Sequence, residues 1–280
     1  MSFAEVITHT QLEKITEMYN DISYTRNDIA TYLNIPYNSV GHVLSFYSIN
    51  SKKKNKEKRH KMSETPKCVN AFNTVTPEIA YVLGYILGDG CLSRSRHRLN
   101  ISSKDLHIVQ DIARVINYPI EDIYKDTKIR DGKTFICYQL NSYDAPTVYT
   151  IIDQFGIGEQ KSNRGCSPVI PCSYESHFLR GLFDSDGCVR VVGKKNSLYK
   201  RLSVEILGHS SYINRFINND YSHLAFNYGK YRNKICCYMN LSKSSNIRKF
   251  YDYIYDNATI YLKRKKKVFD DHYNSRKYNF

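Results

Sequence analysis

The sequence predicts an α+β protein in which one α-β-β-α-β-β-α unit occurs twice after a small all-helical segment. Three observations lead to this prediction. A ten-residue pattern at positions 81–90 returns at positions 178–187. After each copy, the hydrophobic periodicity changes between strand and helix spacing in the same order. Residues 1–51 show helical periodicity alone. With 280 residues, 41% of them hydrophobic, the chain can bury one large core or two modest ones.

The first segment, residues 1–51, is expected to form three helices at 11–19, 26–33 and 36–46. Thr25 followed by Asp28 is a capping-box pattern. The apolar residues of the segment fall at the core positions of a helix-turn-helix. They are Ile29, Ala30, Leu33, Ile35, Val40, Val43 and Leu44.

This spacing resembles that of helix-turn-helix DNA-binding domains. The resemblance implies that the third helix enters the major groove of DNA. The side chains it would offer there are Tyr37, Asn38, Ser39 and His42. The alternative is a plain three-helix bundle that only packs against or pairs with another surface.

Residues 52–75 are expected to form a linker, because residues 52–61 are strongly basic and contain no apolar anchor. Such a run contacts phosphates, serves as a solvated tether or acts as a nuclear localisation signal. The composition does not distinguish between these roles.

Each copy of the repeated pattern is expected to be a helix that packs against the other copy. Small residues recur four positions apart on one helical face, at Gly84 and Gly88 and at Gly181 and Ser185. Small side chains allow two backbones to approach closely. Thr76 is a suitable N-cap for the first helix. Both copies end in Asp-Gly, where glycine is expected to adopt the left-handed conformation that stops a helix.

The aspartate before each terminal glycine is unfavourable at that position. A carboxylate at the C-terminal end of a helix faces the negative end of the helix dipole. Packing the two helices together would also bring Asp89 and Asp186 close to each other, which raises their mutual repulsion. A divalent cation shared by both would relieve both effects. Oxygen ligands favour Mg²⁺, for which Mn²⁺ can substitute.

The elements after the two motifs follow the same order. The first repeat, residues 76–158, is expected to hold strands at 91–94, 98–103, 124–130 and 134–141 and helices at 105–116 and 144–155. A linker at 159–172 leads to the second repeat and a basic tail, residues 173–280, with strands at 188–192, 198–207, 225–230 and 234–241 and helices at 210–219 and 244–256. Cys91 matches Cys188, and Cys137-Tyr138 matches Cys237-Tyr238.

The two motifs resemble those of the LAGLIDADG homing endonucleases in their single-chain, two-motif form. Residues 82–90 and 179–187 fill the nine motif positions, and their last acidic residues, Asp89 and Asp186, are 97 residues apart (186 − 89). The resemblance implies two four-stranded antiparallel sheets that form a saddle about a pseudo-twofold axis. It also implies that Asp89 and Asp186 hold the catalytic metal ions.

The same resemblance concerns four further positions. The earlier acidic position of the motif is Leu87 in one copy and Asp184 in the other; it varies in the family and is not a metal ligand. The family places a catalytic lysine at the end of the second strand, where this chain has Lys104 in the first repeat and His209 in the second. His209 either assists cleavage or simply caps the following helix.

Lys and Arg number 41 against 27 acidic residues, which gives a net charge of +14 and favours a nucleic-acid partner over a basic protein that merely stays soluble. In the strands, alternation predicts that Lys128 and Arg130 share one face while Ile129 faces the helices. The cations expected to contact double-stranded DNA are Arg94, Arg96, Arg98, Lys125, Lys128, Arg130, Lys133, Arg190, Lys194, Lys195, Lys200, Arg201, Lys230, Arg232 and Lys234.

Three classes of function remain open. The first is a monomeric, site-specific DNA endonuclease for intron homing, with a long asymmetric target; the two aspartates favour it. The second is a transcription regulator built on the same fold, and the third is an intron RNA maturase. The eight cysteines lack zinc-site spacing and no segment reaches transmembrane length, so a soluble intracellular protein is expected. Cytoplasm, organelle and nucleus are not distinguished.

Overall fold

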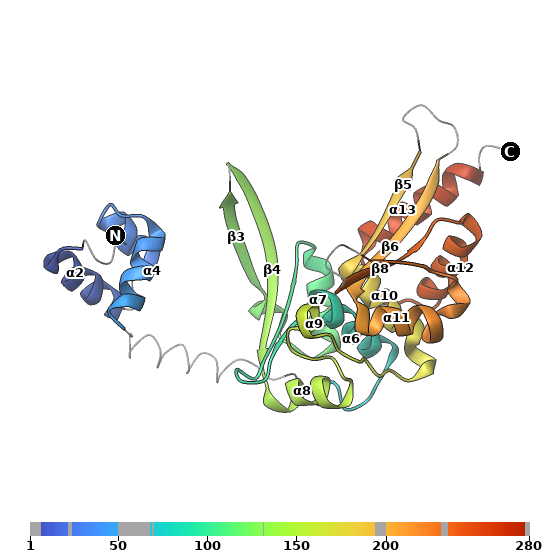
Figure 1. Cartoon of the computed structure of the whole chain (residues 1–280), viewed down its shortest axis with the longest axis horizontal. Helices are drawn as coiled ribbons and strands as arrows, with labels where there is room; N and C mark the ends of the chain where they lie inside the picture. Colours follow the sequence, from blue (N-terminus) through green and yellow to red (C-terminus); the bar gives the residue numbers. More distant parts are fainter. Residues whose placement is uncertain are drawn as a thin grey trace. The chain divides into compact units, whose positions relative to one another are not determined.

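The computed structural model describes residues 7–21, 24–49, 68, 70–130, 132–193, 200–230 and 235–277 (Figure 1). The chain divides into two units, Met1–Thr65 and Pro66–Phe280. The division falls inside the segment that the sequence predicts to be a linker. None of the described helices is long and apolar enough to cross a membrane.

The first unit contains three helices, α2 (His9–Asn20), α3 (Arg26–Tyr32) and α4 (Tyr37–Phe46). The capping box at the start of α3 is present: Thr25 Oγ1 accepts from Asp28 N at 3.2 Å, and Thr25 N donates to Asp28 Oδ2 at 2.6 Å. The core of the unit is built from residues of all three helices. Its buried members are Ile15, Met18, Ile29, Ala30, Val40, Val43 and Leu44.

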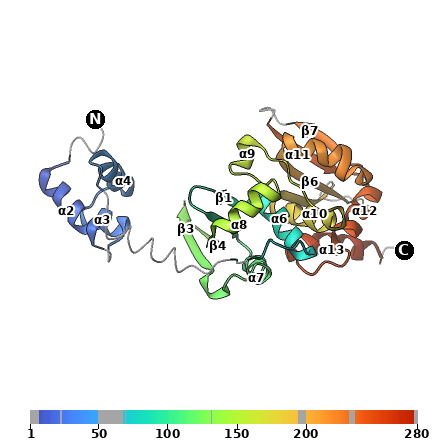
Figure 2. The same cartoon turned by 90° about the horizontal axis from the view of Figure 1, so that it is seen from below.

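The centre of the second unit is a pair of helices, α6 (Pro77–Asp89) and α10 (Glu175–Asp186), which lie side by side (Figure 2). A Cβ atom added at Gly84 would lie 2.0 Å from the carbonyl oxygen of Phe178. One added at Gly181 would lie 2.0 Å from the carbonyl oxygen of Tyr81. Gly84 and Gly181 are equivalent positions of the two motifs, and so are Tyr81 and Phe178. Each helix therefore makes the same contact with the other, which relates the two helices by a pseudo-twofold axis. The predicted close packing is therefore confirmed.

The glycines that end these helices differ from the prediction. Gly90 has φ −74° and Gly187 has φ −86°, so both are extended and neither is left-handed. Glycine is needed here for space. A Cβ atom at Gly90 would lie 2.6 Å from Ile86 Cα, and one at Gly187 would lie 2.4 Å from Phe183 O.

Each repeat contributes one antiparallel four-stranded sheet, and the predicted fold class is confirmed. The first sheet has the order β1-β2-β4-β3, with β1 Cys91–Ser93, β2 Arg98–Ser103, β3 Tyr124–Arg130 and β4 Lys133–Tyr143. The second has the order β5-β6-β8-β7, with β5 Gly187–Val192, β6 Arg201–His209, β7 Asn227–Lys230 and β8 Cys236–Leu241.

Outer helices pack on the apolar faces of both sheets and, with α6 and α10, enclose one core. The longer ones are α7 (Leu106–Val115), α12 (Ser244–Tyr255) and α13 (Lys263–Lys277). Two shorter helices end in a π-helical turn: α8 (Ala145–Tyr149) with η2 (Thr150–Gln154), and α11 (Ser210–Arg215) with η4 (Phe216–Asp220). Single turns complete the unit: η1 (Ile120–Asp122), α9 (Lys161–Arg164), η3 (Cys172–Tyr174) and η5 (Ser222–Leu224).

Strand register relates the two repeats residue by residue. Cys91 pairs with Asn100, and Cys188 pairs with Glu205, so Asn100 and Glu205 are equivalent. Asn100 and Glu205 are 105 residues apart (205 − 100). The same offset makes Lys104 equivalent to His209.

One predicted match between the repeats is wrong. Asn100 pairs with Asn141 and Glu205 with Asn240, which makes Tyr138 equivalent to Cys237 and not to Tyr238. The two Cys-Tyr dipeptides therefore differ by one residue in their position along the strand. Because strand side chains alternate, this slip places the two tyrosines on opposite faces of their sheets.

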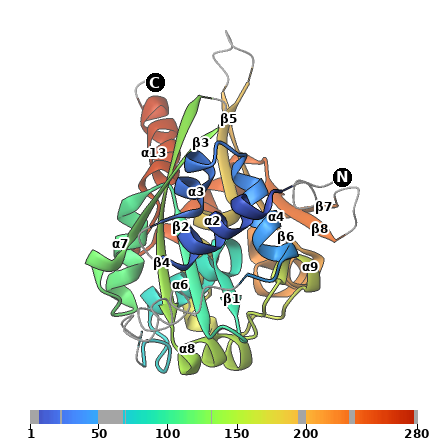
Figure 3. The ribbon, with the colours of Figure 1, turned by 90° about the vertical axis from the view of Figure 1, so that its left-hand side faces the viewer.

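The prediction that Ile129 faces the helices is also wrong, because its side chain is 75% exposed. Phe135 and Ile136 in the neighbouring strand are exposed as well. The outer part of the β3–β4 hairpin extends past the helices that cover the base of the sheet (Figures 1 and 3). Alternation selects the face of a strand, but burial also requires an element on that face.

Candidate active site

Asp89 and Asp186 lie at the adjoining C-terminal ends of α6 and α10. The Asp186 carboxylate is next to the end of α6, because a Cβ atom at Gly88 would lie 3.2 Å from Asp186 Cγ. Ser185, packed on Gly88, turns its hydroxyl back to Gly181 O at 3.1 Å and Leu182 O at 3.0 Å. The small residues thus bring the two carboxylates together as the sequence suggests.

The surroundings disfavour negative charge on both aspartates. Burial and, next, the neighbouring Asp89 raise the pKa of Asp186 to about 6, against the opposing effect of Lys161 and Lys265. Burial also raises the pKa of Asp89, and Lys265, Lys161 and Arg264 act to lower it. The Asp89 side chain still reaches the protein surface, so solvent moderates this effect.

Neither carboxylate has a direct partner within the described part of the chain. Among the residues that the structure describes, no hydrogen bond and no ion pair within 4.0 Å involves Asp89 or Asp186. By contrast, Asp184 is buried and accepts from Tyr81 Oη at 2.8 Å and Leu262 N at 2.7 Å. The earlier acidic position is therefore structural, and the two terminal aspartates have oxygen lone pairs available for a ligand.

Two lysines that sequence reasoning missed lie beside the aspartates. Lys161, in α9, donates from Nζ to the carbonyl oxygen of Gly90 at the end of α6. Lys265, in α13, is buried and donates from Nζ to Phe183 O at 2.6 Å, Asp184 O at 2.8 Å and Gly187 O at 2.5 Å. Lys161, in the linker between the repeats, therefore caps the C-terminal end of α6, and Lys265 caps that of α10. Each lysine offsets the negative end of the dipole of the helix that it caps.

The two lysines also interact with the terminal aspartates, although the carboxylate that acts most strongly on Lys265 is that of Asp184. Burial lowers the pKa of Lys161, and Asp186 is the strongest influence that opposes this. Burial lowers the pKa of Lys265 to about 8, and Lys265 is in turn the strongest cationic influence on Asp89. A motif search could not find these lysines, because they follow their aspartates by unequal distances, 72 and 79 residues (161 − 89 and 265 − 186).

Lys104 and His209 stand at the ends of β2 and β6, at equivalent positions of the two repeats. Lys104 is exposed and makes no polar contact with another described residue. His209 is half-buried, and its Nδ1 accepts from Ser211 N at 3.0 Å and lies 2.9 Å from Ser211 Oγ. The ring therefore caps the start of α11, which is the structural role that the sequence left open for it.

The cations expected to contact DNA do not all lie on one face. Five described side chains project from the face of the sheets opposite the buried residues: Arg98, Lys128, Lys133, Arg190 and Arg201. Arg130 stands opposite Lys133 in the β3–β4 register. Lys125 and Lys230 pair with Tyr138 and Cys237, on the other face. Arg96 and Lys200 are exposed beside the strands.

Arg94 is held away from this face. Its backbone N donates to Glu159 Oε1 at 2.6 Å, its guanidinium pairs with Asp153, and the same group lies 5.0 Å from the ring centre of Tyr149. The remaining expected contacts, Lys194, Lys195, Arg232 and Lys234, lie outside the described residues.

Amide side chains that the sequence did not single out line the same face as the cations. Asn141 Oδ1 accepts from Arg98 Nε at 3.1 Å and from Asn100 Nδ2 at 3.1 Å. In the second sheet, Asn227 Nδ2 donates to Asn240 Oδ1 at 3.2 Å. Arginine and asparagine are the side chains that pair with base edges in a major groove.

In the first unit, α4 presents the residues expected to read DNA. Tyr37, Asn38 and His42 are exposed, and Ser39 is half-buried. Val40 and Val43, on the opposite side of the helix, are buried against α2 and α3. The amphipathic pattern therefore places the four polar side chains on the outer side, where either a groove or solvent can receive them.

No family model matches the chain. The replication factor C small subunit of Methanocaldococcus jannaschii is 24% identical to it over 204 residues. That match covers 69% of this chain and 10% of that protein, so the chain spans about a tenth of the length of the curated relative it matches.

Among solved structures, the LAGLIDADG meganuclease I-AabMI bound to uncleaved DNA aligns with a TM-score of 0.47 at 16% identity, over 72% of this chain and 92% of that one. The meganuclease I-SmaMI bound to uncleavable DNA aligns at 0.47 and 14% identity, over 70% and 87%. Full-length DUF199/WhiA from Thermatoga maritima aligns at 0.43 and 13% identity, over 74% and 64%. Such distant likenesses do not assign a function, which has to follow from the residues of the site.

Proposed function

We propose that this chain is a LAGLIDADG-type, site-specific endonuclease that hydrolyses phosphodiester bonds of double-stranded DNA as a monomer. The observation that carries the proposal is the pair Asp89 and Asp186, which meet at the ends of α6 and α10 without a direct partner among the described residues. If this site bound no ligand, replacing one of the two aspartates with a neutral residue would stabilise the fold, because the surroundings disfavour the ionised form of each.

The two carboxylates suit a divalent metal. No group of three or more His, Cys, Asp or Glu side chains in the described part of the chain could hold a metal ion by itself. Two aspartates would therefore share the ion with water and with the DNA phosphates, a ligand set that Mg²⁺ accepts readily. A bound Mg²⁺ supplies charge neutralisation at the scissile phosphate and lowers the pKa of a bound water.

The lysines would assist the same reaction in two different ways. Hydrolysis places additional negative charge on the phosphate oxygens in the transition state, which a nearby ammonium group stabilises. Lys265 Nζ uses its three donors on main-chain carbonyls, so it would act through its charge. With the described residues Lys161 makes one such contact, to Gly90 O, which leaves two donors for a phosphate oxygen.

The sheets would bind the DNA and hold the phosphates at this site. Arg98 and Arg190 project from the faces that also carry Asn141 and Asn240, so charge and base-reading groups occur together. The net charge of +14 favours binding to any duplex, while the amides are suited to select a sequence. The first unit would add contacts through the exposed side of α4.

The test is cleavage by purified protein of a random or genomic DNA library in the presence of Mg²⁺. We expect cut products that share one long, asymmetric sequence, because two unlike sheets would read the two halves of the site. A protein that binds DNA or structured RNA and cuts neither would instead be a regulator or a maturase, and the nuclease proposal would be wrong.

On the selected target, Asp89→Asn and Asp186→Asn should each reduce cleavage by at least about 10³-fold, in line with losses of single charge-stabilising groups in enzymes. DNA affinity should change little, because neither substitution alters the sheets. Electrophoretic mobility shifts and end-labelled cleavage measure the two properties separately. Asp111→Asn is the matched control, since it removes a half-buried carboxylate of α7 that pairs only with Arg114 among the described residues.

A further inference from the structure

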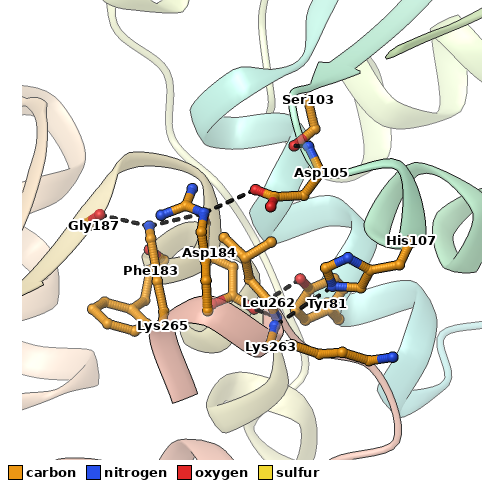
Figure 4. A network of polar contacts seen from close by, with 11 residues as sticks. Tyr81, Ser103, Asp105, His107, Phe183, Asp184, Gly187, Leu262, Lys263 and Lys265 are labelled. Carbon is orange, nitrogen blue, oxygen red and sulfur yellow. Dashed lines mark hydrogen bonds and ion pairs between the residues drawn. The ribbon is translucent and has the colours of Figure 1, made fainter. Parts of the chain in front are cut away.

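The segment Leu262–Lys265, at the start of α13, joins the two repeats (Figure 4). Leu262 N donates to Asp184 in α10, and Lys265 Nζ caps the end of that helix. Between them, Arg264 Nε donates to Asp105 Oδ2 at 2.8 Å, and Asp105 is the N-cap position of α7 in the first repeat. Lys263 N also approaches His107 Nε2, at 3.5 Å.

The linker between the repeats makes the equivalent connection in the other half of the site. Lys161 caps α6 of the first repeat. Five residues later, Cys166 N donates to Ser211 Oγ at 3.1 Å, and Ser211 Oγ donates to Cys166 O at 3.0 Å. Ser211 lies at the start of α11 in the second repeat. Each lysine-bearing segment is therefore anchored on the helix that follows the second strand of the opposite repeat.

The two connections group the four basic residues into two sets. One set holds Lys161 and His209: Lys161 has donors available, whereas the His209 ring is engaged with Ser211. The other set holds Lys265 and Lys104. All three Nζ donors of Lys265 bind main-chain carbonyls, whereas Lys104 is exposed and makes no polar contact to any described residue. Each set therefore has one side chain able to donate to a phosphate.

The connection beside Lys104 is an ion pair, and the connection beside His209 is formed by neutral groups. The Arg264 and Asp105 side chains are 46% and 20% exposed, so their attraction adds little to overall stability. The ion pair instead fixes the position of Lys104 relative to Lys265, because Asp105 directly follows Lys104 and Arg264 directly precedes Lys265.

We propose that Arg264 and Asp105 are positioning residues that hold Lys104 and Lys265 in register with each other and thereby set the cleavage rate of one DNA strand. The proposal rests on the nuclease function above. Small displacements of a catalytic group reduce a rate by about 10²-fold. Breaking the pair frees the chain around Lys104 while leaving the set that contains Lys161 and His209 in place.

The test is strand-resolved, single-turnover cleavage of an end-labelled duplex by the full chain carrying Arg264→Gln or Asp105→Asn. We expect one strand to be cut about tenfold more slowly or worse, the other strand to keep its parental rate, and the Kd for DNA to stay unchanged. The exchanged pair, Asp105→Arg with Arg264→Asp, should recover part of the lost rate. Asp271→Asn is the control, because it breaks the Lys267–Asp271 ion pair of 2.8 Å on the same helix, away from the site.

Three results would overturn the positioning role. Both strands slowing equally would indicate a general loss of structure, and a weaker Kd with unchanged rates would make Arg264 a phosphate contact. Parental rates on both strands would show that the pair does not position anything. A parental protein that cuts neither strand of the selected target would overturn the nuclease function itself, and the two failures are thereby distinguished.

Discussion

At the scale of single residues, the ionised Asp186 carboxylate lowers the free energy of unfolding of the metal-free protein. Its carboxyl has a pKa of about 6 in the folded chain, against an ordinary value of 3.8. Lys265 shows the corresponding effect for a cation, since burial lowers its pKa to about 8. Groups whose charge is disfavoured by the fold, and that meet at one place, are typical of functional sites.

Asp186→Asn should therefore stabilise the metal-free protein at pH 7.5. A carboxyl with a raised folded pKa binds more protons when folded, so stability falls as pH rises from about 4 to above 6. The full shift corresponds to about 3 kcal/mol, and solvent around the half-buried group reduces this to about 1–2 kcal/mol.

Thermal unfolding in EDTA at pH 4 and 7.5 measures this difference, with Asp111→Asn as the control. The gain in Tm should be present at pH 7.5 and nearly absent at pH 4. An Asn variant that is less stable than the parent at pH 7.5 would show that Asp186 is a structural carboxylate.

At the scale of elements, the packing of α6 on α10 determines where the aspartates lie. The helices approach closely enough for backbone atoms of one to occupy the place of a side chain on the other, at Gly84 and at Gly181. Packing at this distance also keeps solvent out of the interface, since the helix residues between Ile79 and Leu87 are buried. The spacing of the carboxylates is thus a property of the helix pair.

Gly84→Ala should destabilise the second unit by about 2–3 kcal/mol or more, because the new methyl group would overlap Phe178 O and force the helices apart. Calorimetry of the full chain measures the shift in Tm of that unit. Gly41→Ala is the matched control. It lies in helix α4, where the nearest atom to an added Cβ is Arg26 Nη1 at 3.8 Å, so alanine should stabilise the first unit by up to about 1 kcal/mol. Equal effects of the two substitutions would contradict the close contact.

At the scale of the whole molecule, the chain joins two units that each have their own core. The catalytic residues proposed here all belong to the second unit. The first unit contributes a helix with exposed polar side chains, and residues 52–61 contribute a basic run. This division predicts that hydrolysis and part of the DNA affinity can be separated.

Deleting residues 1–65 should leave a folded second unit that still cuts the selected target. Its DNA affinity should be weaker, and the dependence of log Kd on log salt concentration should be shallower, because phosphate contacts are lost. Binding titrations at several salt concentrations measure both quantities. Footprinting provides the control on placement: a protected region of unchanged length would show that the first unit does not contact the target.

The sequence by itself determined the duplication, the fold class and the position of Asp89 and Asp186, because each follows from local patterns. Small residues four apart identify a helix face, alternation identifies strands, and Asp-Gly marks the end of each motif helix. The part of the first unit's core that comes from α3 and α4 was predicted for the same reason, since Ile29, Ala30, Val40, Val43 and Leu44 are buried. Leu33 and Ile35 are only partly buried, and the buried Ile15 and Met18 of α2 were not predicted.

Only the tertiary structure decided which cations reach the site and which strand faces are covered. Lys161 and Lys265 carry no motif and follow their aspartates at unequal distances, so their place depends on how α9 and α13 pack. Ile129 lies on the face that alternation predicts but is 75% exposed. The cysteine-tyrosine pairs match in sequence yet differ in register. Local patterns specify the conformation of a segment, whereas burial and pairing depend on distant segments that arrive beside it only when the chain has folded.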